Sequence, residues 1–99
     1  MRRAWRNLDT FIVHDVQWTA SARHSDIVLP ATTSYERNDI EQMGDYAQSH
    51  IVAMKKLVEP VFEARSDFDI FAAIAKRLGK GEEFTAGLTE MEWIRNLYE

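Results

Sequence analysis

The chain has 99 residues, 12 of them basic and 16 acidic, with a formal net charge of -4. The length is near that of one domain, and the acidic balance argues against a general nucleic-acid binder, which needs a basic face to displace counterions. The absence of cysteine excludes disulfides, thiolate metal sites and cysteine nucleophiles, and no apolar run approaches the ~20 residues of a membrane-spanning helix.

The first third of the chain predicts a compact strand–helix–strand element. Residues 11–15 (FIVHD) form a short apolar run typical of a buried strand. Thr19 can cap a brief helical turn over residues 20–24. Residues 26–30 (DIVLP) predict a second strand, which ends at a proline because proline cannot donate to a ladder. Strand, helix and strand in this order indicate a parallel sheet.

The middle of the chain shows no clear hydrophobic period. Residues 31–50 are rich in turn formers and predict a long loop, and a loop of that length is usually functional or disordered. Residues 50–58 (HIVAMKKLV) predict a third strand, which ends before Pro60.

The last third predicts two amphipathic helices. SDFDIFAAIAKRLG begins at the N-cap Ser66, has Asp69 three residues on as in a capping box, and stops at Gly79. TEMEWIRNLYE has the same capping pattern, with Thr89 as the N-cap and Glu92 three residues on. Both helices need an apolar surface to lie on, and three short strands offer only a small one. We therefore expect a segment of a larger α/β domain.

Several common chemistries have no motif here. The histidines at 14, 24 and 50 match no zinc spacing, and none pairs with another at i+4. There is no G-x-S-x-G nucleophile elbow and no glycine-rich phosphate or dinucleotide loop.

The strongest candidates from the residues alone are His14 and Asp15, at the carboxyl end of the first predicted strand. Ligands of open parallel sheets bind just beyond such strand ends. A carboxylate there can accept two hydrogen bonds from the edge of a guanine, and such charge-assisted bonds are stronger than neutral ones. The alternative is that Asp15 only caps the WTASAR turn or ends the strand.

Arg37 and Asp67 are the next candidates. The fixed fork of donors of Arg37 can bind a phosphate, although Arg37 can equally pair with neighbouring carboxylates at Glu36, Asp39 or Glu41. Asp67 lies in the first turn of a predicted helix, where the helix dipole favours a carboxylate in any case. These residues indicate a nucleotide site without excluding a structural role.

Longer stretches carry a resemblance. WTASARHSDIVLPATTSYERNDIE at 18–41, GDY at 44–46, IVAM at 51–54, EARSDFDIF at 63–71, and EEFT and TEMEW within 82–93 resemble, in this order, the molybdopterin oxidoreductases. More narrowly, they are similar to the branch of dimethyl sulfoxide, trimethylamine N-oxide and biotin sulfoxide reductases. Ser25 stands where alanine is commoner in that pattern. The resemblance covers nearly the whole chain.

The resemblance implies an α/β fold: a fragment of a Rossmann-like parallel-sheet cofactor-binding domain with short strands and two C-terminal amphipathic helices. Residues 1–99 are then a single partial domain within a longer oxidoreductase. The cofactor implied for that parent is molybdenum bound by two molybdopterin guanine dinucleotides. His14 and Asp15 would meet its guanosine portion, and Arg37 and Asp67 would be further cofactor contacts.

The serine that binds the metal in this branch has no counterpart in the chain, so no catalytic residue or metal ligand is assigned. We expect the isolated chain to be inactive, to bind no cofactor and to self-associate. The implied partners are the rest of the polypeptide and, for the parent, a small S- or N-oxide and an electron donor, without nucleic acid. The parent is expected in the periplasm, or in the cytoplasm if it is of the biotin sulfoxide type. Alternatives are a stand-alone α/β interaction module and a helical adaptor that uses its tryptophan-rich ends.

Overall fold

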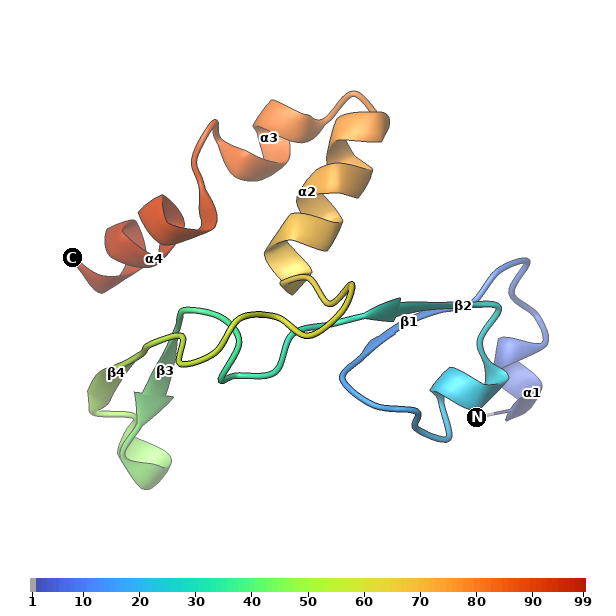
Figure 1. Cartoon of the computed structure of the whole chain (residues 1–99), viewed down its shortest axis with the longest axis horizontal. Coiled ribbons are helices and arrows are strands. Elements are labelled where there is room, and N and C mark those ends of the chain that lie inside the picture. The colour runs from blue at the N-terminus through green and yellow to red at the C-terminus, as the bar shows by residue number, and fades with distance from the viewer. Residues whose placement is uncertain (1) are drawn as a thin grey trace.

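A computed structural model of the chain describes residues 2–99. Figure 1 shows the strand pairs β1–β2 and β3–β4 toward opposite ends of the molecule, with the three C-terminal helices along one side. In chain order the elements, η marking a short 3-10 helix, are α1 (Arg2–Trp5), β1 (Ile12–Asp15), η1 (Ala22–His24), β2 (Ile27–Pro30), β3 (Asp39–Met43), η2 (Asp45–Ala47), β4 (His50–Met54), α2 (Asp67–Arg77), α3 (Gly81–Thr85) and α4 (Glu90–Tyr98).

The predicted strand–helix–strand element is confirmed. Strands β1 and β2 pair in parallel, with Ile12 opposite Ile27 and Asp15 opposite Pro30. The connection contains η1, which is shorter than the predicted turn over residues 20–24 and has Ser21 as its N-cap. Thr19 Oγ1 nevertheless accepts the Ala22 N–H at 3.2 Å. A parallel bridge between residues 31 and 65 continues the sheet beyond β2 and brings the start of α2 to its carboxyl edge.

The prediction of a loop over residues 31–50 is wrong for 39–43, which form β3. This strand pairs antiparallel with β4 in a separate two-stranded sheet, with Asp39 opposite Met54 and Met43 opposite His50. The predicted third strand is therefore confirmed for residues 50–54, but it joins a hairpin instead of the parallel sheet. The hairpin is largely exposed on both faces. Because neither face is buried, no hydrophobic period marks β3 in the sequence.

Both predicted amphipathic helices are present, and their caps explain their limits. Ser66 Oγ accepts the Asp69 N–H at the start of α2, and α4 begins with a complete capping box between Thr89 and Glu92. Helix α2 stops at Gly79, whose φ of 71° is left-handed and whose N–H donates to the Lys76 carbonyl at 3.1 Å. The short α3 was not predicted, because five residues give no measurable period.

The chain buries little apolar surface of its own. Among the residues whose burial the structure describes, the buried apolar ones are Ala22, Ala31 and Ile70. The radius of gyration is 16.0 Å, against about 13 Å for a compact domain of this size. The accessible surface is 8239 Å², whereas ~5,800 Å² is typical of a compact monomer of this mass. Both quantities agree with an α/β fragment whose helices lack part of the surface they are built to cover.

Within residues 2–99, no helix has the length and apolar character that a bilayer crossing requires.

Candidate functional site

The first candidate pair lies where β1 meets α2. His14 Nδ1 is 2.9 Å from Asp67 Oδ1, so the end of the first parallel strand contacts the first residue of α2. The His14 side chain is 17% exposed and that of Asp67 55%. The ring of Phe71, one helical turn along α2, packs on His14 with centroids 4.9 Å apart and planes tilted by 41°. The sequence-predicted residues His14 and Asp67 are thus brought together, on an aromatic support.

Asp15 is turned away from this pair, because successive side chains of a strand point to opposite faces. Its Oδ1 accepts the Val16 N–H at 2.9 Å and its Oδ2 accepts the Thr19 hydroxyl at 2.6 Å. Asp15 therefore holds the turn that follows β1, as the structural interpretation of this residue predicted. A role in binding a ligand remains a prediction.

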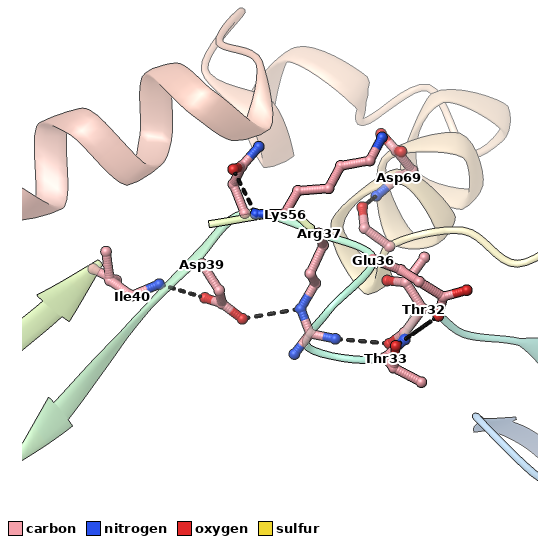
Figure 2. A network of polar contacts seen from close by, with 10 residues as sticks. Thr32, Thr33, Glu36, Arg37, Asp39, Ile40, Lys56 and Asp69 are labelled. Atoms are coloured by element: carbon pink, nitrogen blue, oxygen red, sulfur yellow. Dashed lines mark hydrogen bonds and ion pairs between the residues drawn. The ribbon is translucent and has the colours of Figure 1, made fainter. Parts of the chain in front are cut away.

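Arg37 lies in the connection between β2 and β3 and is held on two sides (Figure 2). Its Nε donates to Asp39 Oδ2 at 3.0 Å, and its Nη1 donates to the Thr32 carbonyl at 2.8 Å. The expected pairing with a neighbouring carboxylate is therefore confirmed for Asp39. A guanidinium has five N–H donors, so these two contacts leave donors for another acceptor.

Arg37 and Asp67 also share a pocket of about 260 Å³. Three carboxylates and the Arg37 guanidinium line it together with aromatic and aliphatic side chains of α2 and α4, a combination that suits a flat heterocycle with polar edges. The other lining residues are Asn38, Asp39, Phe68, Glu90, Trp93, Ile94 and Leu97. Three of the four predicted site residues, His14, Asp67 and Arg37, thus form one continuous region.

The most buried ionisable side chain of the region, Glu36, was missed from the sequence. It is 8% exposed. Its Oε2 accepts the Thr33 N–H at 2.7 Å and the Thr33 hydroxyl at 2.8 Å, and its Oε1 accepts the Val61 N–H at 2.8 Å. These three donated bonds hold the pKa of Glu36 below its ordinary value. The bond from the Thr33 backbone has the largest effect, followed by the bond from the Thr33 hydroxyl and then that from Val61. The spacing T-x-x-E is the signal that could have found it.

Further contacts fasten residues 35–38 to the segment that follows β4. The Tyr35 carbonyl accepts the N–H groups of Leu57 at 2.9 Å and Val58 at 3.2 Å. Asn38 Oδ1 accepts the Lys56 N–H at 3.1 Å. The backbone on both sides of Arg37 is therefore fixed by a part of the chain about twenty residues away in sequence.

No group of three or more histidine, aspartate or glutamate side chains is placed to hold a metal ion in the described part of the chain.

Comparisons with known proteins give this geometry a context. The family model of the molybdopterin oxidoreductases matches residues 1–77. The chain is 69% identical over 99 residues to proteins of Rhodobacter capsulatus and Cereibacter sphaeroides named dimethyl sulfoxide/trimethylamine N-oxide reductase. It is 48% identical over 99 residues to a trimethylamine-N-oxide reductase of Vibrio cholerae. Each match covers 100% of this chain but only 12% of the relative.

Proposed function

The chain belongs to the molybdopterin oxidoreductase family, and from this premise we propose that it serves in a larger reductase of small S- or N-oxides. Within that enzyme it forms a single partial domain and helps to hold the guanosine end of molybdopterin guanine dinucleotide. The observation that carries the proposal is the 69% identity along the entire chain to dimethyl sulfoxide/trimethylamine N-oxide reductases. Because the chain spans 12% of those relatives, the activity is assigned to the longer protein.

The residues of the site fit the nucleotide end of such a cofactor. The Asp67 carboxylate is more than half exposed, and only its Oδ1 is engaged by His14. It can therefore accept two donors from a guanine edge. The free N–H groups of Arg37, which lines the same pocket, suit a phosphate oxygen. Asp15 stays in the proposed set because each of its oxygens has a lone pair beyond the one used in the turn.

This chain contributes binding and orientation. When bound, the molybdenum cofactor supplies the redox chemistry of oxygen-atom transfer from an S- or N-oxide. The residues of the chain fix the nucleotide end through the His14–Asp67 pair and Arg37. None of them is assigned as a metal ligand, so we propose that the chain alone is inactive and that the rest of the polypeptide is its partner. By the same family relationship we place the longer protein in the periplasm, in anaerobic respiration, which cell fractionation can test.

The decisive experiment uses the full-length protein and a matched pair of substitutions in the first turn of α2. Asp67→Asn removes the negative charge at the site, whereas Asp69→Asn removes one from the same helical turn and leaves the His14 contact in place. We expect Asp67→Asn to lower both the molybdenum content, measured by metal analysis, and the amount of guanosine monophosphate released on acid hydrolysis. Each should fall by roughly tenfold, because a charge-assisted pair is lost. Asp69→Asn should change neither. Full content of both in Asp67→Asn and in Arg37→Ala would refute the proposed site.

A further inference from the structure

Glu36 has the least exposed carboxylate among the described residues, and it forms no salt bridge with any of them. Among the buried polar residues Thr32, Glu36 and Ser66, only Glu36 is ionisable. The ion pairs that the structure shows involve other carboxylates. An ionised buried carboxylate is costly unless it is hydrogen-bonded, and the three donated bonds from Thr33 and Val61 meet that need.

A second site in the same chain shows what part of this arrangement is local. Thr89 and Glu92 repeat the geometry of Thr33 and Glu36: the threonine N–H donates to the glutamate Oε2 at 2.7 Å and its hydroxyl does so at 2.8 Å, in both pairs. At Glu92 the motif starts helix α4 and lies exposed. After Glu36 no α-helix follows until α2, and the chain instead enters β3.

What distinguishes Glu36 is its second oxygen. Oε1 accepts the Val61 N–H, 25 residues along the chain. The same two segments are joined again at Tyr35 and at Asn38. Arg37 lies between these attachment points, and its guanidinium is oriented toward Thr32 and Asp39 (Figure 2).

We propose that Glu36 is a positioning residue: its carboxylate fastens the turn that begins at Thr33 to the strap of residues 56–61, and so holds Arg37 at the edge of the pocket it shares with Asp67. The ligand that Arg37 meets there, a phosphate of the nucleotide, rests on the proposed function. The fastening of the two segments does not. The lowered pKa of Glu36 agrees with a carboxylate that is ionised when it accepts these bonds.

The substitutions separate the fastening from other effects. Glu36→Gln keeps the size of the side chain but places an amide donor against one of the backbone or hydroxyl donors. Thr33→Val removes one donated bond without a change of shape, and Thr33→Ser restores the hydroxyl. Glu92→Gln is the matched control, because it removes the same local motif without the contact to Val61.

The experiment is made on the full-length protein, with two readouts. Hydrogen exchange of the cofactor-free protein, followed by mass spectrometry, reports the protection of peptides spanning 33–39 and 56–61. Guanosine monophosphate released from the protein as isolated reports nucleotide occupancy. We expect Glu36→Gln and Thr33→Val to raise exchange about tenfold in both peptides and to lower occupancy severalfold, while Thr33→Ser and Glu92→Gln keep both values. If Glu36→Gln prevents accumulation of the protein, the Thr33→Val and Thr33→Ser pair decides.

The coupling between Glu36→Gln and Arg37→Ala in nucleotide occupancy distinguishes a positioning role from a merely structural one. If Glu36 acts through Arg37, then Glu36→Gln lowers occupancy no further in a protein that already carries Arg37→Ala. Independent, multiplying losses would overturn the positioning role, and so would unchanged exchange of both peptides in Glu36→Gln. Full occupancy in Arg37→Ala, together with faster exchange in Glu36→Gln, would support the fastening and refute the nucleotide contact of Arg37.

Discussion

His14 Nδ1 and Asp67 Oδ1 lie 2.9 Å apart although 53 residues separate them in the sequence. The contact ties the carboxyl end of β1 to the first residue of α2, where the helix dipole also favours a carboxylate. Because Asp67 is 55% exposed, the energy of the pair in water is modest, and its main effect is to fix the orientation of the imidazole and the carboxylate.

A double-mutant cycle of His14→Asn with Asp67→Asn is expected to give a coupling free energy of about 0.2–1 kcal/mol, the range for exposed pairs. Urea unfolding followed by tryptophan fluorescence measures it. The cycle of His14→Asn with Asp69→Asn is the control and is expected to show no coupling, since Asp69 lies in the same turn but does not pair with His14. Equal coupling in the two cycles would contradict the contact.

The turn after β1 depends on the Thr19 hydroxyl, which donates to Asp15 and accepts from Ala22. Thr19→Val removes both bonds and is expected to destabilise the fold by about 1–2 kcal/mol, whereas Thr19→Ser is expected to cost far less. Urea unfolding compares the two. If Asp15 acts mainly in this turn, Thr19→Val and Asp15→Asn will destabilise to a similar extent. A large effect of Asp15→Asn on nucleotide content, with none from Thr19→Val, would instead assign Asp15 to the ligand.

Acid is expected to weaken the fold through Glu36 and Glu92. The pKa of each is held below its ordinary value, first by the N–H of Thr33 or Thr89. A carboxyl whose pKa is lower in the folded state binds fewer protons there than when unfolded, so its stabilisation is complete above the unfolded pKa and is lost as pH falls toward the folded one. Glu36→Gln should therefore flatten the fall of the urea midpoint below the ordinary glutamate pKa, and the double variant with Glu92→Gln should flatten it more. Identical acid slopes in all three proteins would count against this.

A left-handed residue follows each of α2 and α3, namely Gly79 and Ala86. Replacing the glycine by alanine and replacing the alanine by glycine should therefore have opposite effects on stability. Gly79 has φ of 71°, and apart from its chain neighbours no residue has a heavy atom within 4 Å of the position that a Cβ would occupy there, so Gly79→Ala adds only backbone strain and is expected to cost about 1 kcal/mol. Ala86 has φ of 51°, so Ala86→Gly relieves strain and is expected to stabilise by roughly 0.5 kcal/mol after the entropy lost by glycine. Thermal unfolding followed by circular dichroism tests both signs, and a stabilising Gly79→Ala would refute the strain argument.

The apolar face of α2 and α3 predicts self-association of the isolated chain. Phe71, Ile74, Leu78 and Phe84 line one pocket of about 380 Å³, and each of these four side chains is more than a third exposed. Burial of such a face is favourable, so light scattering should show species larger than a monomer, and a hydrophobic dye should bind. Leu78→Glu is expected to reduce both signals, whereas Lys76→Glu on the same helix is not. A monomeric chain that binds no dye would contradict the prediction.

The local elements could be predicted because their causes lie within a few residues. The caps at Ser66 and Thr89, the left-handed stop at Gly79 and the apolar runs of β1 and β2 each depend on a few neighbouring residues, and each is found where the sequence indicates. Strand β3 was missed because its pairing with β4 buries neither face, so no hydrophobic alternation records it.

The sequence by itself determined the family, the parallel strand pair and the two amphipathic helices, and it supplied the residue types of the candidate site. Only the tertiary structure decided which of those residues meet: His14 with Asp67, Arg37 with Thr32 and Asp39, and Glu36 with Val61. It also directed the Asp15 carboxylate toward Val16 and Thr19, in the turn that follows β1. The physical reason is distance along the chain. Periodicity and capping record interactions between near neighbours, whereas contacts spanning 25 or 53 residues depend on how whole elements pack, and no local pattern encodes that.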